Sequence, residues 1–224
     1  MTFARQFALP FPQAHIYAPE HFCPGAANSA ALAWLEAPAA WPGLRLAVHG
    51  EPGTGKTHLL HLFAARHGAA LLPASAIRRL TPPPDACCLA IDDADMVGDA
   101  QALLHLLNAA AERRQPVLLS GQTPPAHWSF TLPDLVSRLR AMQTVALLPP
   151  EDDLLRALLA RLLADRQLRV SDQIRAYLLA HLPRTGGALR EAVARLDRLS
   201  LAAGGMVTRG MAQEVVEEEK DVLF

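Results

Sequence analysis

Cysteines are scarce in this sequence, and their spacing excludes two kinds of stabilised scaffold. The chain has three cysteines, of which Cys87 and Cys88 are adjacent within an apolar run and Cys23 stands apart. No Cys-x-x-Cys pair and no Cys/His spacing typical of zinc occurs, so neither a disulfide framework nor a zinc module is expected. This cysteine usage is typical of buried thiols in a reducing cytosol.

The sequence also lacks an excess of charge and a long apolar run. Its formal net charge is −1, and no cluster of basic residues favours nucleic acid as a ligand. No apolar segment reaches the roughly 18 residues that a membrane-spanning helix needs. Pro10, Pro12 and Pro19 interrupt residues 1–20, which do not have the basic-then-apolar order of a signal peptide. We therefore expect a cytoplasmic protein with no membrane partner and no sequence-specific DNA binding.

Short apolar segments alternate with helical ones in the first two thirds of the chain. Continuous apolar strands that alternate with helices are typical of a parallel sheet covered on both faces, so we expect an α/β domain. The expected helices have apolar residues at helical spacing or helical composition. The expected strands are residues 44–50, 69–74, 86–93, 116–121 and 144–149, and the expected helices are residues 25–37, 56–68 and 100–114.

The pattern changes after Pro149 and Pro150. Only helical segments follow, with Asp, Ser or Thr near their starts, as is typical of helix N-termini. These segments are residues 151–168, 171–182, 187–203 and 208–220. We therefore expect an extended leader at residues 1–20, an α/β domain at 21–149 and an all-helical domain at 150–224.

Residues 50–57, GEPGTGKT, match the phosphate-binding motif G-x-x-x-x-G-K-[ST] between an expected strand and an expected helix. The glycines allow backbone N–H groups to turn toward phosphate oxygens, and the helix adds its positive end. Lys56 is expected to reach the β- and γ-phosphates, and the Thr57 hydroxyl to hold Mg²⁺. The expected nucleotide-binding residues here are Gly50, Glu51, Pro52, Gly53, Thr54, Gly55, Lys56, Thr57 and His58.

Two acids follow the third expected strand. Asp92 is expected to hold Mg²⁺ beside the phosphate-binding loop, and Asp93 to orient a water molecule. The alternative is a solvated cap, which two acids at the end of a strand often form. His58 and His61 lie one turn apart on the helix after the loop. Two histidines are too few for a metal site, so their side chains are expected to pack or to face solvent.

Several motifs together resemble one family. The segments GTGKTHLL, LAIDDAD, LPDLVSRL and FCPGAANSAALAWLEA are similar to the ATPase domain of the bacterial replication initiator DnaA, which belongs to the AAA+ ATPases. The resemblance extends from about residue 20 to residue 215. It implies an AAA+ P-loop NTPase fold, with a five-stranded parallel sheet and a C-terminal helical lid, that binds ADP or ATP with Mg²⁺.

Within that family the sequence is similar to the short Hda-type regulators. It ends at Phe224, soon after the last expected helix, where DnaA continues into a DNA-reading domain. The resemblance implies a protein that binds the DNA polymerase sliding clamp and promotes hydrolysis of the ATP bound to DnaA, with a homodimer or larger oligomer also compatible. One alternative is an autonomous AAA+ ATPase, such as a helicase loader or a clamp-loader-type subunit. The other, a DNA-binding protein of the initiator class, is disfavoured by the neutral charge.

The resemblance assigns catalytic roles to two arginines. Arg138 in LPDLVSRL matches the family's arginine finger, which acts in trans on the nucleotide of a neighbouring subunit. Arg190 in GALREAV matches the sensor-2 arginine, which contacts the bound nucleotide from the lid. The alternatives are a surface charge for Arg138, and for Arg190 an ion pair with Glu191 or Asp197.

One position departs from the family pattern. Gln122 and Thr123 follow the fourth expected strand, at the sensor-1 position where DnaA and its homologues usually carry Asp and Arg. A side-chain amide cannot act as a charged acceptor. We therefore expect at most a weak ATPase, in which the nucleotide is a structural ligand.

The first residues carry a second pattern. Gln6, Leu9 and Phe11 in QFALPF resemble the anchors of the Q-x-x-L-x-F clamp-binding peptide of bacterial replication proteins. Leucine and phenylalanine supply apolar burial, the glutamine amide can donate and accept, and Pro10 keeps the segment extended. The alternative is an apolar tail that packs on its own domain. The C-terminal KDVLF is a poorer match, because Lys220 stands in place of glutamine.

Overall fold

The computed structural model describes residues 17–78, 84–203 and 205–222. They form two compact units, which divide between Pro149 and Pro150. Within these ranges, none of the helices combines the length and the apolar character needed to cross a membrane.

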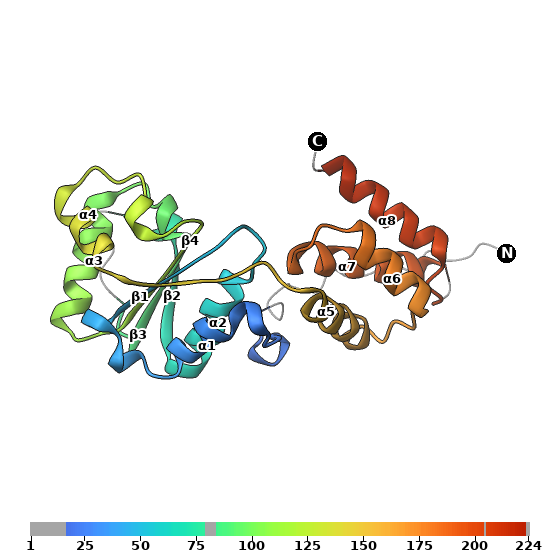
Figure 1. The fold of residues 1–224 in the computed structure, drawn as a ribbon, viewed down its shortest axis with the longest axis horizontal. Coiled ribbons are helices and arrows are strands. Elements are labelled where there is room, and N and C mark those ends of the chain that lie inside the picture. Colours follow the sequence, from blue (N-terminus) through green and yellow to red (C-terminus); the bar gives the residue numbers. More distant parts are fainter. Residues whose placement is uncertain (1–16, 79–83, 204, 223–224) are drawn as a thin grey trace. The chain divides into compact units, whose positions relative to one another are not determined.

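The first unit contains a five-stranded parallel sheet in the order β2-β3-β4-β1-β5 (Figure 1). The predicted α/β fold with a five-stranded parallel sheet is therefore confirmed. This order places β4 between β1, which leads into residues 50–57, and β3, which ends at Asp92. The strands are β1 (Arg45–His49), β2 (Ala69–Pro73), β3 (Cys88–Asp92), β4 (Val117–Gly121) and β5 (Gln143–Ala146).

Helices cover both faces of this sheet (Figure 1). Successive residues of β1 alternate between the two faces: Leu46 and Val48 are buried against α1 and α2, and Ala47 against the core that α3 and α4 cover. Burial on both faces explains why the strands are continuous apolar runs in the sequence. The helices are α1 (Ala26–Leu35), α2 (Lys56–His67), α3 (Ala100–Glu112) and α4 (Pro133–Arg140).

Two elements of the sheet domain differ from the sequence-based expectations. The last strand ends at Ala146, although Leu147 N still donates to His49 O at 2.7 Å. Pro149 and Pro150 have no N–H to continue such a ladder. Helix α4 was not expected, because its eight residues are too short to give a clear helical period.

The leader also differs where the structure describes it. Residues 1–20 were expected to be extended, but Pro19–His21 form a 3-10 turn, which the proline at its first position favours. The expected clamp-binding residues Gln6, Leu9 and Phe11 lie outside the described residues.

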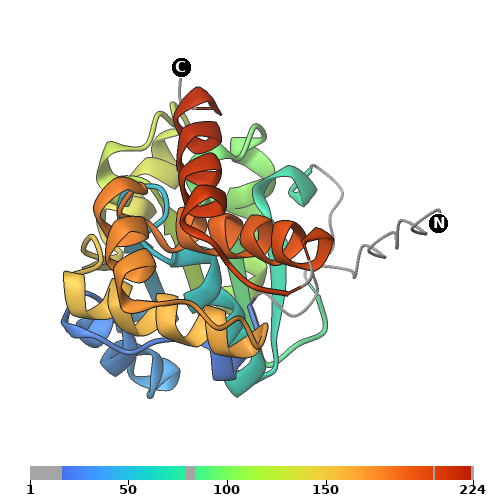
Figure 2. The same cartoon turned by 90° about the vertical axis from the view of Figure 1, so that its right-hand side faces the viewer.

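The second unit is a bundle of helices, and its described residues include no strand. Helix α8 packs against α6 and α7, and α5 packs against α6 and α7 (Figure 2). Two of the helices begin with the expected caps: Ser171 Oγ accepts from Ile174 N, and Thr185 Oγ1 accepts from Ala188 N. The helices are α5 (Asp152–Asp165), α6 (Asp172–His181), α7 (Gly186–Ala202) and α8 (Arg209–Val222).

Candidate nucleotide-binding site

The loop between β1 and α2 passes very close to the neighbouring strand ends. Gly50 N donates to Gly121 O, at the end of β4, over 3.3 Å. A Cβ atom added at Gly50 would lie only 2.4 Å from Leu147 O, so no larger residue fits there. Gly53 and Gly55 have φ angles of 82° and 99°, in the left-handed region that glycine adopts without strain. The close backbone contact explains the glycine at position 50, and the positive φ angles explain those at positions 53 and 55.

We expect Gly50→Ala to lower the melting temperature, because the added methyl group forces the backbone away from Leu147 O. Overpacking of this kind typically costs about 1–3 kcal/mol, which corresponds to several degrees in a chain of this size. Gly98→Ala is the matched control, since an added Cβ there meets no atom within 4 Å. Thermal melts of the two variants measure the effect, and equal melting temperatures would contradict the steric explanation.

Lys56 is a buried cation at the start of α2. Only 7 % of its surface is exposed, and its Nζ donates to Gly50 O at 2.7 Å and to Glu51 O at 3.0 Å. Burial lowers the pKa of Lys56, and nearby carboxylates oppose this shift. The ammonium group is thus held over the loop, where an entering anion would find a strong hydrogen-bond donor.

The N-terminus of α2 offers further donors. The N-cap residue is Gly55, and no side chain among the described residues caps this helix. The first N–H groups of a helix have no intrahelical acceptor, and the positive end of its dipole favours an anion. Thr57, the second residue of α2, is partly buried and adds a hydroxyl. The residues present therefore fit the phosphates of a nucleotide, with Thr57 available as a ligand for Mg²⁺.

The ends of β3 and β4 bring polar side chains to the same edge of the sheet. Ser120 Oγ donates to Asp92 Oδ1 at 2.6 Å and accepts from Asp93 N at 2.8 Å. Just beyond the same two strands, Asp95 Oδ2 accepts from Gln122 N at 2.8 Å. These bonds fix the acids of β3 to the end of β4, which itself contacts the phosphate-binding loop.

The charges of Asp92, Asp93, Asp95 and Lys56 influence one another. Partial burial raises the pKa of Asp93, the Asp92 and Asp95 carboxylates raise it further, and Lys56 lowers it. Within the described ranges, no three His, Cys, Asp or Glu side chains are arranged to hold a metal ion by themselves. The expected ligands Thr57 and Asp92 suit instead a Mg²⁺ ion that phosphate oxygens also hold.

Sequence reasoning missed Ser120 and Asp95. Ser120 is fully buried in an otherwise apolar strand, and Asp95 lies two residues beyond the acidic pair. A buried serine needs a hydrogen-bond partner, so its position in a core strand was a signal that a partner lies on a neighbouring strand.

His58 faces the segment that precedes α1. It is buried, with its Nε2 atom 3.1 Å from Ala18 O. The Tyr17 and Phe22 rings meet it edge-on, at centroid distances of 5.7 and 5.1 Å, and Tyr17 also stacks on His61 at 4.6 Å. These contacts fasten residues 17–22 to the helix that begins at the phosphate-binding loop.

Arg138 lies at the opposite end of the sheet from the loop. Its Nε and Nη2 atoms donate to the two carboxylate oxygens of Asp134, at 3.0 and 3.4 Å. Burial and then the Arg138 cation lower the pKa of Arg45, the first residue of β1. Helix α4, which carries Arg138, ends at Arg140 and leads into β5, whose first residue Gln143 pairs with Leu46 near the start of β1. The loop that holds Lys56 follows the last residue of β1. The two ends of this strand lie roughly 13 Å apart at about 3.3 Å per residue.

Arg190 lies near the start of α7, in the second unit. The two acids considered as its ion-pair partners both contact other arginines: Glu191 pairs with Arg195 at 3.2 Å, and Asp197 approaches Arg166 at 3.9 Å. The sensor-2 role of Arg190 stays a prediction.

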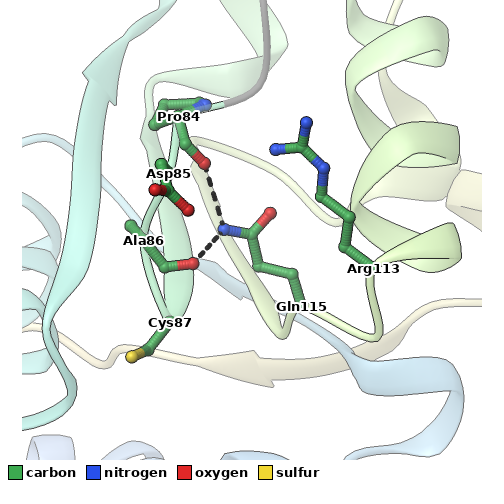
Figure 3. A pocket seen from close by; sticks show the side chains of 6 residues that line it. All are labelled: Pro84, Asp85, Ala86, Cys87, Arg113 and Gln115. Carbon is green, nitrogen blue, oxygen red and sulfur yellow. Dashed lines mark hydrogen bonds between the residues drawn. The ribbon is translucent and has the colours of Figure 1, made fainter.

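A separate pocket lies at the amino ends of β3 and β4 (Figure 3). Gln115 Nε2 donates to the carbonyl oxygens of Pro84 and Ala86, and so ties together the segments that lead into these strands. Ligands of open parallel sheets bind at the carboxyl ends of the strands, so this pocket is not the nucleotide site. Its lining residues are Pro84, Asp85, Ala86, Cys87, Arg113 and Gln115.

Comparisons with known proteins agree with this architecture. No protein-family model matches the sequence. Domain III of the Thermotoga maritima replication initiation protein DnaA is similar, with a TM-score of 0.79 and 19% identity over 95% of this chain and 99% of that one. AMPPCP-bound DnaA from Aquifex aeolicus has a TM-score of 0.70 and 19% identity, over 95% of this chain and 71% of that one.

A third similar structure is a motor protein with another role. The Thermotoga maritima RuvB Holliday junction branch migration motor has a TM-score of 0.60 and 20% identity, over 86% of this chain and 69% of that one. At these identities the likeness concerns the fold, and it extends over both units. The chain therefore has a DnaA-like fold.

Proposed function

We propose that this chain is a nucleotide-bound AAA+ regulator of the initiation of chromosome replication. In this proposal it binds the DNA polymerase sliding clamp and promotes hydrolysis of the ATP bound to DnaA. The DnaA-like fold supports a role in replication, and the Hda-like sequence motifs support the more specific regulatory role.

The position of Arg138 is the observation that carries this proposal. Helix α4, which carries Arg138, leads into β5 beside the start of β1, whereas the phosphate-binding loop follows the end of β1. We infer that the guanidinium does not act on the nucleotide of its own chain. It is partly exposed, with 33% of its side-chain surface accessible. A guanidinium is planar, permanently charged and able to contact two phosphate oxygens at once. Arg138 is therefore suited to complete the active site of a second AAA+ protein.

In this proposal residues 50–57 would hold ADP or ATP, and Thr57 and Asp92 would be ligands of Mg²⁺. Similar DnaA structures contain AMPPCP, one of them together with single-stranded DNA. Lys56 would bind the terminal phosphates, Asp93 would hold water, and Arg190 would contact the nucleotide from the lid. The bound Mg²⁺ supplies charge neutralisation at the phosphates.

We expect Lys56→Ala to abolish nucleotide binding, because it removes the buried cation of the loop. In the parent, Mg²⁺ and ADP at about 100 times the Kd should stabilise the fold by about 2.7 kcal/mol, which raises the melting temperature by several degrees. Arg66→Ala on the same helix is the control, since Arg66 forms an exposed ion pair with Glu36. Thermal melts with and without ADP measure both. A parent curve that ADP leaves unmoved, or an undiminished rise in Lys56→Ala, would contradict the binding role.

The proposed clamp-binding residues Gln6, Leu9 and Phe11 precede residues 17–22, which contact α2. Tyr17, which stacks on His61, comes six positions after Phe11. Six residues span at most roughly 20 Å. A chain bound to the clamp through this peptide would therefore keep its nucleotide-binding unit close to the clamp.

A pull-down with three candidate partners separates this function from the alternative of an autonomous helicase loader or clamp-loader-type subunit. The sliding clamp, DnaA and the replicative helicase are each incubated with the protein, with and without ADP. We expect retention of the clamp, and retention of DnaA that depends on ADP. Retention of the helicase alone would overturn the proposal in favour of a helicase loader.

A further inference from the structure

Asp95 is the last acid of the LAIDDAD segment, and the predictions above give it no role. It lies in the 3-10 turn Ala94–Met96 that follows β3, and this turn is closed by a bond from Met96 N to Asp93 O at 2.8 Å. From there its carboxylate reaches the next strand end, where Oδ2 accepts from Gln122 N at 2.8 Å.

This hydrogen bond connects Asp95 to the phosphate-binding loop. Gln122 follows Gly121, whose carbonyl oxygen accepts from Gly50 N at 3.3 Å. The carbonyl oxygen of Gly50 in turn accepts from Lys56 Nζ at 2.7 Å. Asp95 therefore fixes the peptide at which β4 leaves the sheet, directly beside the loop.

The other carboxylate oxygen of Asp95 is unsatisfied. Oδ1 is closed off from solvent and has no hydrogen-bond donor within residues 17–78, 84–203 and 205–222. Buried polar atoms of this kind are usually satisfied by an ordered water molecule or an ion. The Asp95 charge raises the pKa of Lys56 and that of Asp93. The unsatisfied oxygen atom therefore lies among the charged side chains beside the expected phosphates.

We propose that Asp95 is a positioning residue of the nucleotide site, whose Oδ2 fixes the end of β4 and whose Oδ1 holds an ordered water molecule. It supplies from the end of β3 the charged acceptor that the Gln122 side chain lacks. The side chain of Gln122 is exposed and its backbone N–H makes the bond to Asp95, so we expect the side chain to be dispensable. This inference rests on the proposed binding of nucleotide by residues 50–57.

Two substitutions separate water ordering from simple support of the fold. Asp95→Asn keeps an oxygen that can accept from Gln122 N but loses the charge, whereas Asp95→Ala loses both. Gln122→Ala is the matched control, since it leaves the backbone bond in place. Each variant is compared with the parent in ADP affinity, in hydrogen exchange of the residue 122 amide without nucleotide, and in the slow single-turnover hydrolysis of bound ATP.

We expect the residue 122 amide to exchange at least about tenfold faster in Asp95→Ala than in the parent, and at a nearly unchanged rate in Asp95→Asn. Both Asp95 variants should lose at least about tenfold in hydrolysis rate while keeping their affinity for ADP. Gln122→Ala should stay within about threefold of the parent in all measurements.

Three results would overturn the inference: full hydrolysis in Asp95→Asn, an equal loss in Gln122→Ala, or no measurable hydrolysis in the parent. Unchanged amide exchange in Asp95→Ala would also overturn it, and this arm needs no nucleotide. Failure of the parent to bind ADP would instead contradict the proposed function, so the two failures are distinguishable.

Discussion

Arg138→Ala is expected to abolish the stimulation of ATP hydrolysis on DnaA, with a fall in rate on the order of 10³ or more. An arginine finger supplied in trans stabilises the charge that develops on the transferred phosphoryl group, and alanine offers no substitute. Within its own chain the substitution removes a partly exposed ion pair with Asp134, worth at most about 1 kcal/mol. The fold, ADP binding and clamp binding should therefore be unchanged.

The rate is measured in a single turnover on DnaA loaded with labelled ATP, in the presence of DNA-loaded clamp. Arg140→Ala is the matched control, because Arg140 is an exposed arginine on the same helix, two positions away. It should stimulate as well as the parent. Full stimulation by Arg138→Ala, or an equal loss in Arg140→Ala, would rule out a specific finger.

Replacing Leu9 and Phe11 together by alanine should weaken clamp binding by roughly three orders of magnitude. Apolar anchors of a docked peptide typically act as hot spots that cost about 2 kcal/mol each, which is about thirtyfold in Kd. Gln6→Ala alone should cost about thirtyfold. Proline has a fixed φ angle, so Pro10 should limit the entropy lost on docking.

Surface-bound clamp and a concentration series of each variant give these affinities. A chain without Leu223 and Phe224 is the control for the C-terminal KDVLF pattern, and it should bind as the parent does. Undiminished binding after both N-terminal changes, with loss on removal of Leu223 and Phe224, would transfer the role to the C-terminus.

The strands and the phosphate-binding loop could be predicted because their signals are local. Buried parallel strands are continuous apolar runs, and the glycines of residues 50–57 mark a tight loop beside other backbone. The strand order could not be predicted in this way. That β4 lies between β1 and β3 depends on pairings between residues far apart in the chain, such as Leu89 with Val117.

The sequence analysis missed Ser120 and Asp95 for the same reason, because their contacts join residues far apart in the chain. The partners of Ser120 and Asp95 lie at the ends of different strands, at sequence separations of 28 and 27. Their roles follow from the strand order, and no short motif contains both members of either pair. Arg138 shows the same limit, because its local sequence is equally consistent with a surface charge. Its separation from the loop follows from strand pairing, since α4 leads into β5, whose first residue Gln143 pairs with Leu46 near the start of β1.

Hydrolysis of ATP preloaded on DnaA, followed with one component omitted at a time, gives the most direct test of the proposed regulatory function. The reactions contain DnaA, sliding clamp loaded on DNA, and this protein with ADP. We predict rapid hydrolysis only when all are present, and the slow rate of DnaA alone when the clamp or this protein is omitted. A rate that this protein leaves unchanged in the complete mixture would contradict the function, and an equal rise without the clamp would contradict its dependence on clamp binding.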